Sequence, residues 1–211
     1  MLKLVADVSI APETGLGCSG DGHFAGRDSK PFFTIGHSTR SIQAFIGLLR
    51  EAEANFVVDV RTVPRSRTNP QFNREVLPES LADHMIGYEH MPALGGLRGK
   101  WRGDEASPNT FWQNDSFRNY ADYALTDDFR RGLDFLLALG SRRRCAIMCA
   151  EAVWWRCHRR IIADYLIVRG ASVLHIMGPG QLEPAVLTQA AEPGPLGLIY
   201  RAAEGQDLLP L

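Results

Sequence analysis

The chain has 211 residues, of which 45% are hydrophobic and 22% are charged. This length and composition fit one globular domain with its own core, and they exclude a chain disordered throughout and a small disulfide scaffold. The 23 basic and 24 acidic residues nearly balance, which argues against a surface coated with positive charge for nucleic-acid binding. No apolar run reaches the roughly 18 residues of a membrane span, so no membrane partner is expected.

The distribution of cysteines indicates the compartment. Three of the four, Cys145, Cys149 and Cys157, fall close together, whereas a disulfide framework in a secreted domain is usually spread more widely. The N-terminal segment, with Asp7 and Glu13, has no uninterrupted apolar stretch and does not predict a secretory signal. Both observations favour a reduced, cytoplasmic protein.

The first thirty residues differ from the rest of the chain. Residues 1–30 are rich in Gly, Ser and Asp without a helical or strand period, and they are expected to form an irregular N-terminal extension. Residues 31–211 are expected to form a single α/β domain, with 181–211 as a tail or an additional edge strand.

From residue 31 onward, short apolar runs alternate with helical patterns. Apolar and β-branched runs predict strands at 32–36, 56–60, 88–91, 144–149 and 172–176. Helical periodicity, with N-caps at Ser41 and Thr126 and a terminator at Gly170, predicts helices at 42–52, 78–86, 115–124, 127–139 and 157–169. The alternation predicts a three-layer α/β sandwich with a mainly parallel, Rossmann-like sheet of about five strands and helices on both faces.

Ligands of such sheets bind where the strands end, and here the segments after the strands are rich in arginine. The loop after the second strand contains no acidic residue. Its basic residues and those of the two later loops are Arg61, Arg65, Arg67 and Arg74, then Arg98, Lys100 and Arg102, then Arg156, Arg159 and Arg160. Guanidinium groups match phosphate or carboxylate, so the sequence predicts an anionic, phosphate-bearing ligand. The alternative is that these loops are simply charged and pair with acidic residues elsewhere.

Most of the candidate nucleophilic and acid–base residues lie between the fourth predicted strand and the last predicted helix. Cys149 ends the strand, and Cys157 and His158 are expected to begin the helix, where the N-terminus lowers the pKa of a nucleophilic thiol. His158 is a candidate acid or base, as is Glu151 if tryptophans desolvate it. The alternative for the cysteines is that they are small core residues.

A metal site is the alternative interpretation of this segment. Cys149, Cys157 and His158, with a distant histidine such as His37 or His90, offer suitable ligands, but Cys-x7-Cys-His is not a recognised zinc spacing. The sequence therefore predicts no cofactor, and a metal held by this group remains a minor alternative.

Other candidates follow the first two strands. His37 either contacts a ligand or holds the neighbouring loop, and Asp59 with Arg61 forms either an ion pair or a substrate clamp. Asn73 suits a base or sugar as well as an ordinary turn. Aromatic side chains able to stack on a base are Tyr88, Trp101, Trp112, Trp154 and Trp155.

Many short motifs occur together in a fixed order. They are Thr34–Ser38, Val58–Arg61, Pro64–Arg67, Asn69–Asn73, Leu94–Gly96, Asn119–Tyr123, Met148–Glu151 and Trp155–Arg159. Over about residues 31–178 the chain resembles the family called domain of unknown function 488. The resemblance implies that eight residues share one site, and it implies no activity. These residues are His37, Asp59, Arg61, Cys149, Glu151, Cys157, His158 and Arg159.

The order of elements is also weakly similar to rhodanese-type domains. Those domains and the Cys-dependent phosphatases use a Cys-x5-Arg loop, whereas Cys149 and Arg156 here form Cys-x6-Arg, with Trp154 and Trp155 in place of glycines. The departure weakens the case for their chemistry.

Three functions therefore remain. The leading hypothesis is a hydrolase or transferase acting on a nucleotide, a nucleoside derivative or a nucleic acid. The alternatives are a rhodanese-like, Cys-based sulfur or phosphoryl transferase and a non-catalytic nucleic-acid-binding module. The oligomeric state is left open.

Overall fold

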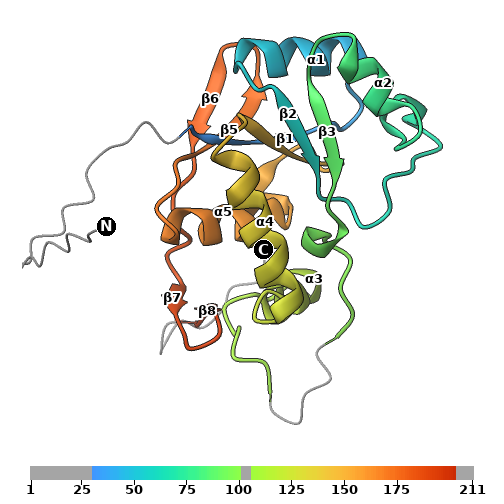
Figure 1. The fold of residues 1–211 in the computed structure, drawn as a ribbon. Helices are drawn as coiled ribbons and strands as arrows, with labels where there is room; N and C mark the ends of the chain where they lie inside the picture. The colour runs from blue at the N-terminus through green and yellow to red at the C-terminus, as the bar shows by residue number, and fades with distance from the viewer. Residues whose placement is uncertain (1–29, 101–105, 203–211) are drawn as a thin grey trace, which may run out of the picture.

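The computed structural model describes residues 30–100 and 106–202 (Figure 1). The extension predicted at 1–30 therefore lies almost entirely outside the described residues, as do Trp101 and Arg102.

Six strands form one central sheet in the order β3-β2-β4-β1-β5-β6. They are β1 (Phe32–Gly36), β2 (Phe56–Asp59), β3 (Gly87–His90), β4 (Cys145–Cys149), β5 (Val173–Gly178) and β6 (Gln181–Pro184). The first five are parallel, as the alternation of elements predicted, and β6 runs antiparallel to β5 at the edge. The mixed α/β prediction is confirmed, with one strand more than the five expected.

Helices cover both faces of the sheet (Figure 1). On one face lie α1 (Ile42–Glu51) and α2 (Leu77–Ala82), and on the other α3 (Asp115–Tyr123), α4 (Asp127–Gly140) and α5 (Arg159–Val168). The N-caps form as predicted, because the side chains of Ser41 and Thr126 accept hydrogen bonds from the first turns of α1 and α4. The described helices include none that is long and apolar enough to cross a bilayer.

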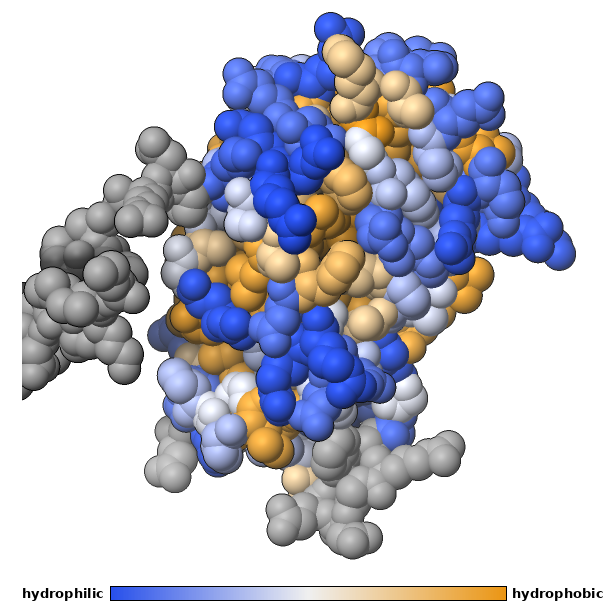
Figure 2. Space-filling view, viewed as in Figure 1, coloured by the Kyte–Doolittle hydropathy of each residue, from blue (hydrophilic) through white to orange (hydrophobic). Residues whose placement is uncertain are grey.

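The core consists of two layers separated by the sheet. Successive strand residues point to opposite faces, so Phe33 and Val57 pack under α1 and α2, whereas Phe32 and Val58 pack under α4 and α5. Figure 2 shows hydrophobic atoms exposed in the middle of the face on which α4 lies, and Phe135 of α4 is 55% exposed.

The C-terminal segment packs onto the domain through a two-stranded hairpin, β7 (Ala191–Pro193) and β8 (Leu198–Tyr200). Tyr200 is fully buried, and its hydroxyl donates to Asp164 of α5 over 3.0 Å. Asp164 also accepts a hydrogen bond from the Thr188 backbone N–H, at 2.9 Å. Burial raises the pKa of this carboxyl.

The last helix begins two residues later than predicted. Trp154–Arg156 form a single 3-10 turn, and Cys157 follows it with an extended backbone before α5 begins at Arg159. The Cys157 N–H donates to Trp154 O, so this thiol does not sit on a free helix N-terminus as expected.

Candidate functional site

The carboxyl ends of β1, β2 and β4 lie side by side. Gly36 is in register with Cys149, and Asp59 with Met148, so the segments after these strands leave the sheet together. A side chain on Gly36 would overlap the Glu151 carbonyl, which explains why the first of these turns needs glycine.

Two adjoining cavities open at these strand ends. The first, of about 300 Å³, is lined by the thiol–imidazole cluster described below, by Arg61 and Arg156, and by apolar side chains that include Leu97 and Phe117. The second, of about 440 Å³, lies beside His37 and Arg65. The residues that line both are Arg61, Val63, Ala150 and Glu151.

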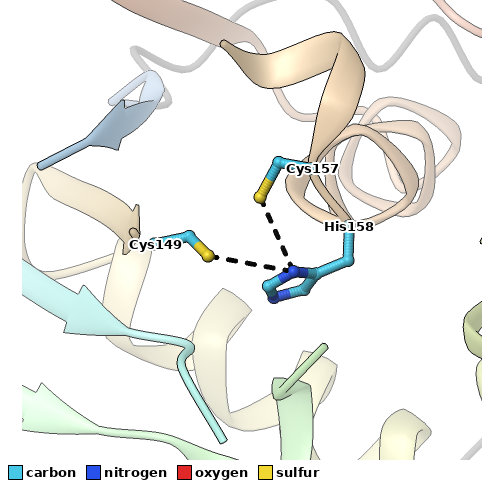
Figure 3. Close-up of side chains that lie close together, drawn as sticks. All are labelled: Cys149, Cys157 and His158. Carbon is cyan, nitrogen blue, oxygen red and sulfur yellow. Dashed lines mark hydrogen bonds between the residues drawn. The ribbon is translucent and has the colours of Figure 1, made fainter. Parts of the chain in front are cut away.

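Cys149, Cys157 and His158 form a compact cluster in the first cavity (Figure 3). The His158 Nδ1 atom lies 3.6 Å from the Cys157 sulfur and 4.0 Å from the Cys149 sulfur. Cys149 comes from the end of β4, whereas Cys157 and His158 precede α5. The short turn between these two elements brings the three side chains together.

The two thiols differ in their tendency to ionise. Burial alone would raise the pKa of Cys157, but a hydrogen bond from Cys149 and the charges of His158 and Arg159 lower it well below its usual value. The Arg159 Nε–H donates to the Cys157 sulfur over 3.2 Å. The pKa of Cys149 is raised, because its thiol donates to Cys157 and is itself buried. Cys157 is therefore the thiol that ionises first.

Contacts with the backbone fix the ring of His158. Its Nε2 lies 3.1 Å from the Val60 carbonyl oxygen, which can only accept, so Nε2 carries the proton and Nδ1 faces the cysteines. The Tyr120 ring packs against the imidazole with centroids 4.9 Å apart. A side chain on Gly96 would overlap Nδ1, so this glycine permits the close approach of its loop.

Asp59 and Arg61 form a buried ion pair. The Arg61 Nε and Nη2 groups donate to the two carboxylate oxygens at 2.8 and 2.6 Å, and Nη2 also donates to the Phe72 carbonyl. The Tyr88 hydroxyl donates to the same carboxylate at 2.8 Å. Burial raises the pKa of Tyr88. Most donors of Arg61 are thus committed within the protein, which favours the ion pair that the sequence left as one of two options.

His37 is also enclosed by its surroundings. It stacks on Phe72 with centroids 4.3 Å apart, and Arg61 Nη1 lies 3.2 Å from its Nε2. Its Nδ1 donates to the Ser38 carbonyl over 2.9 Å. Burial lowers the pKa of His37 to about 4, which keeps the ring neutral at physiological pH. These contacts make His37 a support for Arg61.

Several of the predicted side chains are exposed to solvent. Arg65, Arg67 and Arg156 are exposed, and none forms an ion pair with another described residue. Glu151 is exposed as well, so the desolvation expected for it does not occur. Trp154 stacks instead on His175, with centroids 4.5 Å apart, and Trp155 is 46% exposed.

Other predicted residues serve the framework. Asn73 accepts a hydrogen bond from the Ser66 N–H, which is turn chemistry, and Arg159 is 1% exposed and donates to the Glu151 carbonyl over 2.6 Å. Arg98 lies over the Tyr123 ring, at 3.5 Å from its centroid, and Arg160 contacts Trp112. The arginines predicted at this edge of the sheet thus fall into two groups. Some are exposed without an ion pair to another described residue, and others are held by contacts within the protein.

The sequence did not single out the residues that form the cavity wall. Thr62, Leu97, Ser116 and Phe117 line it beside Gly96. The only signal available was the order of motifs, because Leu94–Gly96 and Asn119–Tyr123 stand close to this wall in the chain.

Comparison with known proteins identifies the family of this chain. A search of curated proteins found no match, and a search of solved structures found none either. A family model described as "Domain of unknown function DUF488" matches residues 41–166, which is more than half of the chain. The protein therefore belongs to the DUF488 family, as its motifs suggested.

Proposed function

We propose that the protein is an enzyme acting on a phosphate-bearing substrate, namely a nucleotide, a nucleoside derivative or a nucleic acid. One observation carries the proposal. Arginines without an ion-pair partner among the described residues and a thiol–imidazole cluster border the same adjoining cavities. Binding groups and reacting groups therefore face one space.

The exposed arginines supply the anion-binding part. Arg156 lines the first cavity and Arg65 the second, while Glu151 is the only acidic side chain among the described residues that line them. Guanidinium groups at a partly enclosed surface attract phosphate through charge and paired N–H donors. Arg61 contributes positive potential at the centre, although Asp59 offsets its charge.

The walls of the first cavity suit the uncharged part of such a substrate. Leu97, Val63 and Phe117 give it an apolar lining. Aromatic and aliphatic surfaces of this kind hold unpaired bases by stacking and packing. The reacting bond would then lie beside Cys157 and His158, which provide nucleophilic or acid–base groups for a hydrolase or transferase.

Thermal stabilisation tests this proposal. Nucleotides and short oligonucleotides should raise Tm, and the matching nucleosides without phosphate should not. A ligand at about 100 times its Kd stabilises by about 2.7 kcal/mol, which corresponds to several degrees. Arg156→Gln and Arg65→Gln should reduce the shift, whereas Arg143→Gln, at the opposite end of β4, should leave it intact.

Two results would count against the enzyme. If nucleosides stabilise the protein as well as nucleotides do, phosphate is not what the site recognises. Salt-sensitive binding of oligonucleotides that persists in His158→Asn, without turnover of any phosphate ester, would identify a binding module instead.

A second candidate function is a Cys-based sulfur or phosphoryl transfer. It is favoured by the lowered pKa of Cys157, to which hydrogen bonds from Arg159 and Cys149 contribute. The 3-10 turn at Trp154–Arg156 interrupts the loop that would cradle the transferred group, which disfavours it. Full turnover in both Cys149→Ser and Cys157→Ser would exclude this chemistry.

A further inference from the structure

The spacing of three donor atoms in the cluster matches that of a bound metal ion. Tetrahedral zinc, with Zn–S of about 2.3 Å and Zn–N of about 2.0–2.1 Å, holds nitrogen and sulfur ligands about 3.6 Å apart and two sulfurs about 3.8 Å apart. Here Nδ1 of His158 lies 3.6 and 4.0 Å from the two sulfurs, and all three atoms lie within 4.8 Å of one another. Only small side-chain shifts separate this arrangement from coordination.

The imidazole already presents the correct nitrogen. Because Nε2–H of His158 donates to the Val60 carbonyl, Nδ1 is the ring nitrogen that faces Cys149 and Cys157. Histidine ligands of metals characteristically donate their other ring N–H to a backbone carbonyl or a carboxylate, which fixes both tautomer and orientation. The Val60 contact provides such support before any metal is bound.

The electrostatic environment also fits a dication bound by two thiolates. Two thiolates and one divalent cation sum to zero charge, so the complex avoids the cost of burying an isolated ion. The Arg159 Nε–H donates to the Cys157 sulfur, which supports a thiolate ligand from outside the coordination sphere. Soft sulfur ligands with an imidazole favour zinc over magnesium or calcium, which prefer oxygen.

The described residues place only three such ligands together, and the cluster borders a cavity. Structural zinc sites have four protein ligands, whereas catalytic sites keep one position for water or substrate. The first cavity, beside Leu97 and Phe117, would give that fourth position access to a ligand. Gly96 keeps the imidazole uncrowded on this side.

We propose that Cys149, Cys157 and His158 bind one zinc ion through two thiolates and Nδ1, with the fourth position facing the first cavity. The unusual Cys-x7-Cys-His spacing works because the sheet edge and the turn before α5 supply the ligands, rather than a zinc-finger loop. The inference rests on the cluster itself and requires no phosphate-bearing substrate.

Metal binding to the full-length, reduced protein tests the proposal without any substrate. After removal of metal with a chelator, the chain should take up one equivalent of zinc, measured by elemental analysis. Cobalt(II) in its place should give a thiolate-to-cobalt absorption band in the near ultraviolet. If the wild-type protein retains no zinc on gel filtration and gives no such band, the proposal is wrong.

Matched variants assign the ligands. Cys149→Ser, Cys157→Ser and His158→Asn should each weaken zinc binding by about 100-fold or more. Cys145→Ser, at the opposite end of the same strand, should bind as the wild type does. Equal loss in Cys145→Ser and Cys149→Ser would overturn the assignment. Because zinc is titrated alone, loss of nucleotide binding would contradict the proposed function and leave this result unaffected.

Discussion

Contacts with backbone carbonyls determine which ring nitrogen of His37 and of His158 faces the site. His158 donates from Nε2 to Val60, and His37 donates from Nδ1 to Ser38, so the two rings use opposite nitrogens for their backbone contacts. His37 thereby accepts from Arg61 and supports it, whereas His158 directs Nδ1 toward two sulfurs. Identical side chains thus have different roles because their single backbone partners differ.

Gly96→Ala should weaken zinc binding at the site without destabilising the fold. The added methyl group would overlap Nδ1 of His158, so the ring or the Gly96 loop must shift and the placement of Nδ1 beside the cysteines is disturbed. We expect zinc affinity to fall by about 10-fold or more, as it does when groups that orient a ligand are lost, while Tm of the metal-free protein changes little. Gly99→Ala, where an added Cβ meets nothing, is the control. Unchanged zinc affinity in Gly96→Ala would contradict this role.

The buried His175 should make stability depend on pH. Burial and the charge of Arg159 lower its pKa to about 4, whereas the unfolded chain binds the proton near 6.5. Stability is complete above about pH 6.5 and falls as pH drops toward about 4, because the unfolded state then binds more protons. From about pH 7 to about pH 5 this group accounts for about 2 kcal/mol. Urea denaturation of His175→Asn should show a shallower pH slope than the wild type.

The exposed His84 provides the control for that slope. His84→Asn should retain the wild-type pH dependence. His37 carries a similar shift, so part of the slope should persist in His175→Asn. A slope that is unchanged in His175→Asn would show that this ring does not titrate as described.

Elements with a strong local pattern were predictable, and those that depend on distant partners were not. The five parallel strands and the caps of α1 and α4 follow from apolar runs and single polar residues. The strands β7 and β8 have three residues each, too few for a period, and buried contacts far away in the sequence hold them.

Prediction of the candidate site from the sequence met the same limit. The rule that ligands bind at strand ends led to the prediction that Cys149, Cys157 and His158 belong to one site. It did not reveal which arginines are free, because Arg61 and Arg159 look like Arg65 and Arg156 until their buried partners are known. Composition of a loop indicates charge, whereas availability of that charge depends on packing.

Substitutions of Tyr200 should show how much the contact between the hairpin and α5 contributes to the free energy of unfolding. Tyr200→Phe removes the hydroxyl that donates to Asp164 and leaves a buried carboxylate oxygen without it, so we expect a loss of about 1–3 kcal/mol. Tyr200→Ala also opens a cavity, and about 3–5 kcal/mol should be lost. Denaturant unfolding measures both. If Tyr200→Phe is as stable as the wild type, the bond to Asp164 adds nothing to anchoring the hairpin.

For the whole molecule, the order of strands predicts a gradient of stability. β4 and β1 occupy the middle of the sheet between two core layers, whereas every residue of the edge strand β6 is exposed. Central strands of this kind open only when the whole protein unfolds, and exposed edges open locally.

Native-state hydrogen exchange should display this gradient. Amides in β4, such as Ile147, should exchange with the free energy of global unfolding, and those of β6 should exchange by smaller openings at lower cost. Peptides covering both strands can be compared in one mass-spectrometric experiment. Equal protection in β4 and β6 would mean that the sheet opens as a single unit.

The cluster and the cavity walls have separate origins in the chain. Cys149, Cys157 and His158 belong to one strand–turn–helix segment, whereas the walls come from the loops after β2 and β3 and from α3, through Thr62, Leu97 and Phe117. Insertions and exchanges in those loops can therefore reshape the cavity without displacing the thiol–imidazole cluster. Such an architecture lets the shape of the cavity diverge during evolution while the cluster itself is kept.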